Sequence, residues 1–592
     1  MRSPESSFDA RDGAQRSDTR NNDTSPENPA ANNSVEREDR HNDNDDPTPQ
    51  IPEPSSNITG WRLIITLLLL SLTAFVVSLD DTIVATAIPR ITDDFHSIAD
   101  VAWYGSAYLL TLGGMQLLFG KLYAIHSDKK IYTGSLCIFI TGSTVCGTAS
   151  SSVVMIFGRA LAGVGAAGLV TGALIIIAHS APLRLRPVYT SIVGSMTAVG
   201  SVAGPLLGGV ITDRLSWRWC FYINLPIIGT LLALFLFLYR PRRRQQSPSS
   251  SGLLCGGSRL QRVLRYDPLG NLAFLFAVVC FQIALQWGGA QFSWHSPRVV
   301  ALFVSSAVLL MIFAPVEWMM GQHATLNVRI ARQRTVASSG ALIALLGASY
   351  YSAIYYLPLW FQGVQGASPT HSGVLSIALL ISMIVSSLLS AGLVSKTGYY
   401  NPFALAAPIL AACGTGLLTT LEPDSGPGEY IGYQVLLGIG IGCGFHQPFI
   451  AVQAVLPEAD VASGIGLIMC AEMLGGALGI AVSQKIFENQ LVAFVNKSRP
   501  EIHASAILQT GATGLAALLP EKSSKEVAKA YSDAVTATFY LAAGLAAAGF
   551  VAACFMEWKN IKKTEGDDDD DRSKGEEIEI DETVKRPREL TV

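Results

Sequence analysis

Fourteen apolar windows, each long enough to cross a membrane as a helix, follow one another along this chain of 592 residues. The hydrocarbon core of a bilayer is about 30 Å thick and needs about 20 apolar residues per helix. Backbone amides cannot stay unpaired in lipid, so these windows are predicted to be helices rather than strands. They lie near residues 62–82, 101–120, 131–150, 155–178, 188–209, 219–239, 268–288, 299–319, 336–358, 372–394, 402–421, 431–454, 462–486 and 534–556. The sequence therefore predicts an all-α integral membrane protein with 14 transmembrane helices.

The composition excludes several classes of soluble protein. Charged residues make up only 15% of the chain, and 49% of its residues are hydrophobic, whereas about 25% charged residues is usual for soluble domains. This argues against an ordinary soluble enzyme, a nucleic-acid-binding protein and a disordered chain. Hydrophilic residues gather at the two ends, where residues 1–60 are predicted to form a disordered tail and residues 557–592 an acidic one.

The distribution of Lys and Arg predicts how the chain is oriented in the membrane. Numbered by the spans that they join, the even loops carry 16 Lys and Arg residues and the short odd loops carry four. Positive loops stay in the cytoplasm, so both termini are expected to be cytoplasmic. The long odd loop, about 487–533, is then external. It contains the sequon Asn496-Lys497-Ser498, which makes Asn496 a candidate glycosylation site.

Two sequence strings place charged residues in or beside apolar spans. Asp80 closes the first span within Leu79–Pro89, and it either has a role in gating or proton handling or simply marks the membrane boundary. Arg159 lies inside the fourth span, within Gly158–Gly168. A buried arginine is costly unless it faces a cavity or a partner, which favours a functional role. The alternative is an arginine near the outer interface that extends to water.

A third string, Gly200–Gly209, ends the fifth span. Gly200, Gly204 and Gly208 recur every four residues and share one helix face, while Gly209 follows directly. Pro205 removes a backbone donor and can kink the helix. Ordinary packing of small residues is the alternative reading.

These three strings together resemble the major facilitator superfamily, in particular its fourteen-span drug:proton antiporters, which include fungal toxin and multidrug efflux pumps. The resemblance covers about 61–556 and implies two six-helix halves plus two inserted helices. The halves are expected at 61–240 and 321–556, with a basic cytoplasmic loop at 241–267 and the inserted helices at 268–320. It also implies that Asp80 and Arg159 take part in proton coupling, and that Gly200–Gly209 is the antiporter motif.

Two departures from the family pattern concern charged residues. Ala124 stands where the loop after the second span usually has an aspartate, so Asp128 is a candidate substitute. Glu472 lies inside the thirteenth span and is a third candidate for proton coupling, because buried carboxyls can bind a proton near neutral pH. The alternative is a neutral glutamic acid that only packs.

Aromatic and polar side chains in the ninth and twelfth spans are candidates for the wall of a central substrate cavity. They are Tyr350, Tyr351, Tyr355, His446 and Gln447. An aromatic belt at the membrane interface is the alternative for tyrosines near a helix end.

The predicted function is export of small organic compounds, such as a toxin, secondary metabolite or drug, in exchange for protons by alternating access. No Walker string, metal-binding motif or catalytic cluster occurs in the sequence, so no enzyme activity, cofactor or metal is expected. The expected partners are the lipid bilayer, a small apolar organic substrate and protons, without nucleic acid, in a monomer. The cell membrane is the expected location, with the vacuolar membrane as the alternative. Proton-coupled import of a nutrient or siderophore and a transport-dead sensor are the alternative functions.

Overall fold

The computed structural model describes residues 60–95, 101–239, 267–288, 292–321, 324–367, 369–498 and 524–562. The predicted tails before residue 60 and after residue 562, and the basic loop through residue 266, lie outside this set. The chain divides into two units, Met1–Ser55 and Ser56–Val592, and everything below concerns the second. Within the described residues all regular elements are helices, apart from two isolated β-bridges.

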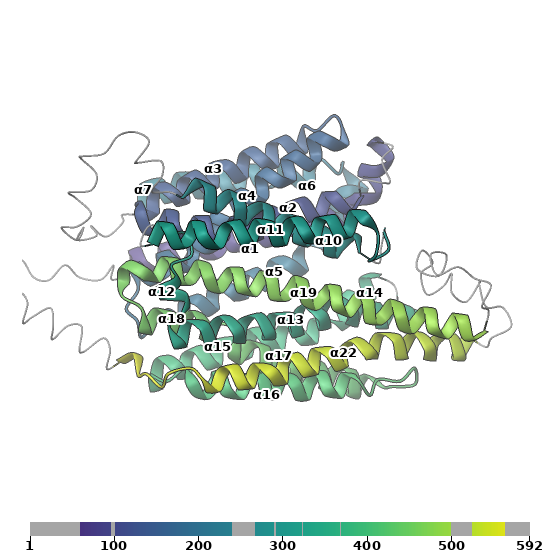
Figure 1. The fold of residues 1–592 in the computed structure, drawn as a ribbon. Helices are drawn as coiled ribbons and strands as arrows, with labels where there is room; N and C mark the ends of the chain where they lie inside the picture. Colours follow the sequence, from purple (N-terminus) through teal and green to yellow (C-terminus); the bar gives the residue numbers. More distant parts are fainter. Residues whose placement is uncertain are drawn as a thin grey trace, which may run out of the picture. The chain divides into compact units, whose positions relative to one another are not determined.

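The first six predicted spans form one group of helices. Their bounds are α1 Trp61–Phe95, α2 Val101–Ile125, α3 Asp128–Gly147, α4 Ser152–Ser180, α5 Arg186–Arg214, α6 Trp219–Tyr222 and α7 Asn224–Leu238. Helix α1 packs against α5, and α4 packs against both α2 and α3 (Figure 1). The predicted span at 219–239 is divided, since a short α6 precedes α7.

The remaining helices comprise the inserted pair and a second six-span group. The pair is α10 Pro268–Trp287 and α11 Pro297–Met320; the group is α12 Val328–Ala331, α13 Arg334–Gly363, α14 Pro369–Leu375, α15 Ile377–Thr397, α16 Asn401–Leu418, α17 Pro427–Gly444, α18 Gln447–Val455, α19 Glu458–Ser498 and α22 Ser524–Cys554. Helix α13 packs against α19 and α22, and α17 packs against α15 and α16. The two groups meet where α19 contacts α2 and where α15 contacts α5.

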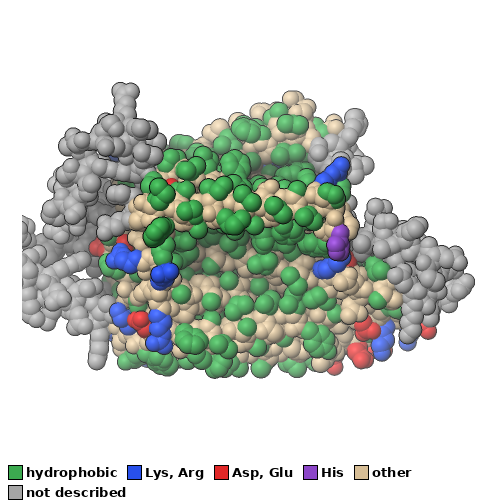
Figure 2. All heavy atoms as spheres, in the orientation of Figure 1, with side chains coloured by type: hydrophobic (Ala, Val, Ile, Leu, Met, Phe, Trp, Pro, Cys, Tyr) green, Lys and Arg blue, Asp and Glu red, His purple; other side chains and the backbone are tan. Residues whose placement is uncertain are grey.

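Thirteen helical stretches in the described part of the chain are long and apolar enough to cross a membrane. The exception among the predicted spans is α3, whose sequence is rich in Ser, Thr and Gly. The surface agrees with a lipid environment, because large apolar side chains such as Phe157, Phe237 and Met311 are exposed. On the face shown in Figure 2, charged side chains gather at the two ends and leave an apolar middle.

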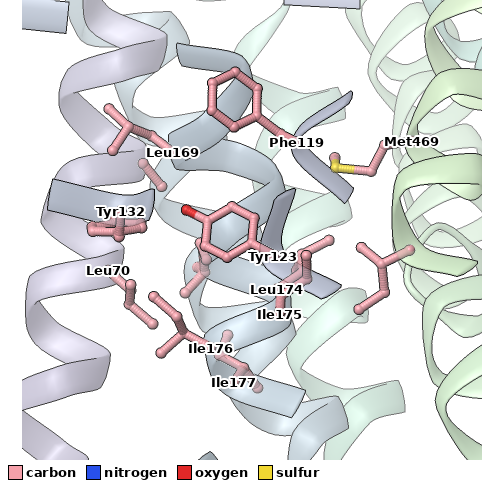
Figure 3. Packing of buried hydrophobic residues seen from close by; sticks show 14 of the residues in the cluster. Leu70, Phe119, Tyr123, Tyr132, Leu169, Leu174, Ile175, Ile176, Ile177 and Met469 are labelled. Carbon is pink, nitrogen blue, oxygen red and sulfur yellow. The ribbon is translucent and has the colours of Figure 1, made fainter. Parts of the chain in front are cut away.

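Each helix group has its own apolar core. Tyr123, Tyr132 and Phe139 are fully or almost fully buried in the first core, and Met469 of α19 joins it from the second group (Figure 3). The second core contains the fully buried Trp360, whose indole nitrogen donates a hydrogen bond to Ser532 at 2.8 Å. The two cores share residues across the halves, since Val336 of α13, Phe449 of α18 and Ile465 of α19 also belong to the first core.

Two predicted boundaries need correction. Helix α19 runs for 41 residues to Ser498 and α22 begins at Ser524, so helical structure covers both ends of the loop predicted at 487–533. At 1.5 Å per residue α19 is about 60 Å long, and it therefore extends beyond a 30 Å hydrocarbon layer. Asn496 lies in the last turns of α19, but its side chain is outside the described set, so its glycosylation stays a prediction.

The acidic tail predicted from residue 557 begins within the folded unit. Burial raises the pKa of the Tyr400 phenol, which keeps the hydroxyl protonated as a donor to the Glu557 carbonyl at 2.6 Å. Ile561 donates to the Gly398 carbonyl at 2.9 Å. Gly398 has φ +86°, a conformation that glycine adopts without steric cost. Residues 557–562 therefore dock on the loop between α15 and α16.

The inserted pair is anchored to α2 by a buried polar chain. Lys121 of α2 donates to Thr325 Oγ1 at 3.2 Å, and this hydroxyl donates to Asp267 at 3.0 Å. Asp267 caps α10 by accepting from Gly270 N at 2.9 Å. Its backbone has a left-handed conformation with φ 48°. This conformation is unfavourable for a residue other than glycine, and it persists because the surrounding contacts hold it in place.

Helix α3 compensates for its low hydropathy by close packing on α4. A Cβ added at Gly165 would lie 2.6 Å from Phe139 N, and one added at Gly142 would lie 2.4 Å from Ala162 N. Both contacts are to backbone, so no side chain can move aside. Glycine on each helix thus lets the two backbones touch, as small residues do in membrane bundles.

We expect Gly165→Ala to lower the stability of the detergent-solubilised protein by about 1–3 kcal/mol, because the added methyl group forces α3 and α4 apart. Gly134→Ala is the matched control, since nothing lies within 4 Å of a Cβ at that position of α3. The control should be neutral or slightly stabilising through its better helix propensity. Thermal unfolding followed by circular dichroism measures both, and equal melting temperatures would contradict the packing argument.

Candidate functional site

A fully buried ion pair joins the first and fourth predicted spans. Arg159 Nη1 of α4 lies 2.7 Å from Asp80 Oδ2 of α1, and both side chains have no exposed surface. The same nitrogen also lies 3.3 Å from the Asp80 carbonyl. The sequence predicted a role for each residue separately, and the structure brings the two together. Burying two charges is costly, and their mutual attraction in a medium of low dielectric offsets that cost.

Two further helices, α2 and α7, complete the surroundings of the pair. Asn224, the first residue of α7, donates through Nδ2 to Asp80 Oδ1 at 2.6 Å. Arg159 Nε donates to the Tyr104 carbonyl of α2 at 2.9 Å. The guanidinium carbon lies 4.3 Å from the centre of the Tyr108 ring, a cation–π arrangement. Both oxygens of Asp80 therefore have partners, and α1, α2, α4 and α7 meet at this one charge pair.

A second carboxylate stands beside the pair. Asp81 Oδ1 lies 4.0 Å from Arg159 Nη2, and 34% of the Asp81 side-chain surface is exposed. Arg159 Nη2 is buried and has no hydrogen-bond partner among the described residues. Arg159 Nη1 is thus paired with Asp80, whereas Nη2 faces the more exposed carboxylate of Asp81.

The Gly200–Gly209 string packs α5 against the part of α1 that carries Asp80 and Asp81. A Cβ at Gly200 would lie 2.5 Å from the Phe75 carbonyl, and one at Gly204 would lie 2.9 Å from Ile83 N. Gly208 is buried and Pro205 is exposed, whereas a Cβ at Gly209 would meet open space. Gly200 and Gly204 therefore permit backbone contact with α1, and Gly209 does not need to be glycine for packing.

Aromatic rings connect α13 to the break between α17 and α18. The ring centroids of Tyr350 and Tyr351 are 5.2 Å apart, those of Tyr350 and Phe445 are 5.8 Å apart, and those of Phe445 and His446 are 6.1 Å apart. His446 in turn packs on Gly194 of α5, where an added Cβ would lie 2.4 Å from Nε2. The predicted cavity residues Tyr350, Tyr351 and His446 thus form one continuous row.

The other two predicted cavity residues differ in their surroundings. Tyr355 is 59% exposed, one turn beyond Tyr351. Gln447 is buried and donates through Nε2 to the Cys443 carbonyl at 2.9 Å, while its Oε1 has no partner among the described residues. Gln447 is therefore the one of the two that has unused hydrogen-bonding capacity inside the protein.

Glu472 of α19 is buried, with 6% of its surface exposed. A Cβ on Gly347 of α13 would lie 3.7 Å from its Cγ, and no ion pair joins its carboxyl to another described residue. Tyr351 interacts electrostatically with both Glu472 and Asp81. Glu472 thus lies in the half opposite to the Asp80–Arg159 pair. Tyr351 lies close enough to interact electrostatically with Glu472 in one half and with Asp81 in the other.

Several residues of the site carry no signal in the sequence. Asn224 begins a helix after an irregular segment, and Tyr104 contributes only its carbonyl, so neither spacing nor composition identifies them. Asp81 was visible as the second acid of the Asp80-Asp81 pair. Asp128, the candidate substitute for the missing loop aspartate, is paired with His179 Nδ1 of α4 at 2.8 Å. That contact stays within the first six-helix half.

Among the residues that the structure describes, no group of three or more His, Cys, Asp or Glu side chains is arranged to hold a metal ion.

The matches to known proteins extend over most of the chain. The family description "Major Facilitator Superfamily" matches residues 70–480. The chain is 44% identical to the efflux pump roqT of Penicillium rubens, a match that covers 88% of this chain and 95% of that protein. It is 43% identical to the efflux pump aflT of Aspergillus parasiticus, with 86% and 98% covered. A solved structure of the proton:xylose symporter XylE shares the fold, with a TM-score of 0.54 and 11% identity over 85% of this chain and 98% of that one.

We expect Asp80→Asn to destabilise the protein by about 3–5 kcal/mol, because it leaves the buried Arg159 charge without its counter-ion. The double variant Asp80→Asn/Arg159→Gln removes both charges and should recover part of that loss. Thermal unfolding of the three variants and the unchanged protein forms a double-mutant cycle. Additive losses in this cycle would show that the two side chains do not stabilise each other.

Proposed function

This chain belongs to the major facilitator superfamily, and on that premise we propose that it is an efflux pump for small organic compounds driven by proton exchange. The carrying observation is its identity of 43–44% with proteins named as efflux pumps, over 86–88% of its length. These relatives are transporters, which argues against an enzyme. A toxin, secondary metabolite or drug is the proposed cargo class, and a proton gradient is the proposed energy source.

The buried charge network supports the proton-coupled part of the proposal. Ionisable residues inside a membrane protein are costly and typically serve proton or substrate pathways. Arg159 and Asp80 neutralise each other at 2.7 Å, so protonation of an acid beside Arg159 changes the charge balance of four packed helices. Glu472 in the opposite half is a second proposed coupling residue, because it is buried without a charged partner among the described residues.

The proposed cargo site is the row of rings formed by Tyr351, Tyr350, Phe445 and His446. It extends from α13 to Gly194 of α5 and so contacts both six-helix halves. Aromatic walls bind broad apolar ligands through their large surfaces, and a few polar groups orient the ligand. The unpaired Gln447 Oε1 is a candidate for such a polar group.

Contacts between the halves support transport by alternating access. Several of them lie near the end predicted to be cytoplasmic, where Arg184 Nε donates to the Ser395 carbonyl at 3.2 Å. At the same end, a Cβ on Gly466 of α19 would lie 3.2 Å from Gly120 Cα of α2. Leu183, from the loop after α4, is buried in the core of the other half. These contacts correspond to a state closed towards the cytoplasm, and opening them would complete the cycle.

The proposed location is the cell membrane, with both termini in the cytoplasm as the distribution of Lys and Arg predicts. The vacuolar membrane is the alternative. Import of a nutrient or siderophore would require uptake from an acidic exterior, and a sensor would give ligand-dependent output without flux. The names of the relatives favour export over both.

Flux into sealed inside-out vesicles tests the proposed function. With an inside-acid gradient, we expect gradient-dependent uptake of at least one compound from a panel of apolar toxins and drugs. Arg159→Ala should abolish this uptake because it removes the centre of the charge network. Arg332→Ala is the matched control, since that arginine is exposed in a loop. Uptake only into right-side-out vesicles with an acidic exterior would identify an importer instead.

A second experiment tests the closed contact between α2 and α19. We expect Gly466→Trp to prevent the backbones from meeting at Gly120, so amide hydrogen exchange should increase at the cytoplasmic ends of both helices and gradient-driven uptake should be lost. Gly544→Trp on α22 is the control, because a Cβ there meets open space. Unchanged exchange in Gly466→Trp would contradict the assignment of this contact as the closed gate.

A further inference from the structure

The Asp80 carboxylate is poorly placed to exchange a proton. Its Oδ2 accepts from Arg159 at 2.7 Å and its Oδ1 accepts from Asn224 at 2.6 Å. The side chain has no exposed surface. A proton binding there would weaken the attraction to Arg159 and would have to enter a site without exposed surface. Asp80 is therefore better described as the fixed counter-ion of Arg159.

The neighbouring carboxylate of Asp81 has the opposite properties. One third of its side-chain surface is exposed, with 34% accessible. No hydrogen bond from another described residue reaches its oxygens, and its nearest charged partner, Arg159 Nη2, is 4.0 Å away. That nitrogen is fully buried and has no hydrogen-bond partner among the described residues. The unused arm of the arginine thus points towards an acid that is partly exposed.

The charge balance assigns the exchangeable charge to Asp81. Arg159 carries one positive charge, and the fixed Asp80 cancels it at 2.7 Å. An ionised Asp81 leaves the group of three with one net negative charge, whereas a protonated Asp81 leaves it neutral. Taking a charge out of bulk water is costly unless it is compensated. One proton on either aspartate would restore neutrality, and Asp81 is the one that close donors do not already hold.

Among the described residues, the groups on the surrounding helices do not supply another compensating positive charge. The titratable groups that interact electrostatically with Asp81 are Asp80 on α1, Tyr108 on α2, Arg159 on α4 and Tyr351 on α13. Helices α5 and α7 present the uncharged Ser201 and Asn224 nearby, where Ser201 bonds Ser78 at 2.7 Å and Asn224 bonds Asp80. Arg159 is the one cation in this set.

We propose that Asp81, and not Asp80, is the carboxylate that exchanges the coupling proton, in a role that rests on the proposed antiport. A proton from the water-accessible side binds an Asp81 oxygen, turning the carboxylate into a neutral acid and ending its attraction to Arg159 Nη2. The same O–H bond breaks when the proton leaves on the other side of the membrane, and the attraction returns. Asp80 keeps Arg159 in position in both states.

The sequence context explains why Asp81 is easily overlooked. In the string Leu79–Pro89, Asp80 holds the position that the family resemblance singles out, whereas Asp81 occupies the next, open position. Two successive helix positions point about 100° apart, so only one of the two carboxylates can lie in the buried pair. The other is directed towards the exposed side.

The test records infrared difference spectra of the purified, full-length protein without cargo. The pH of the solution is lowered from alkaline to mildly acidic during the measurement. We expect carbonyl bands of protonated carboxylic acids to grow in the unchanged protein, and one of these bands, the Asp81 band, to be absent in Asp81→Asn. Asp81→Glu should restore a titrating band. Glu472→Gln and Asp94→Asn are the matched controls, and both should keep the Asp81 band; Asp94 is an exposed acid on the same helix.

Two results would overturn the assignment. One is a set of titrating bands that stays complete in Asp81→Asn and loses a band only in Glu472→Gln, which would assign the proton to Glu472. The other is the absence of any such band in the unchanged protein. Equal melting temperatures of Asp81→Asn and the unchanged protein would exclude misfolding as the cause of a lost band. The measurement needs no transport, so a titrating Asp81 in a protein without flux would contradict the efflux function and its coupling, while Asp81 would remain the carboxyl that binds the proton.

Discussion

The ion pair between Asp80 and Arg159 is the interaction on which the first six-helix half depends. It lies where α1, α2, α4 and α7 meet, and both side chains are completely buried. Removing either partner would leave an uncompensated charge in a medium of low dielectric, a far larger penalty than losing an exposed ion pair. The helices around it are therefore held in one arrangement as long as the pair exists. A protonation event one residue away acts on all of them through the same guanidinium.

Close backbone packing transmits such a change through the molecule. Glycines at Gly200 and Gly204 place α5 directly on α1, the helix that carries both aspartates. Helix α5 then contacts α15 of the other half, and Gly194 of α5 supports His446. A shift of α1 against its neighbours thus has a short physical route to the aromatic row. At Gly200 and Gly204 no layer of side chains separates α1 from α5, so these two backbones must move together.

Buried hydrogen bonds fix the inserted helices to the first six-helix half. The buried chain of Lys121, Thr325 and Asp267 joins them to α2, and the left-handed Asp267 holds its place by capping α10. Lys121 lies three residues before Ala124 in the last turns of α2. The acid at the start of the inserted pair therefore anchors the end of α2.

Hydropathy alone determined the all-α membrane architecture, because about 20 apolar residues can only be helical in lipid. It also located Asp80, Arg159 and Glu472, since a charge stands out in an apolar span. Hydropathy did not determine partners: Asn224 and Tyr104 join the ion pair through helices distant in sequence. Hydropathy did not predict the length of α19, because the helix continues beyond its apolar window into polar residues. Only the tertiary structure decided which of two adjacent aspartates is buried, since neighbouring helix positions face different surroundings and burial depends on what packs there.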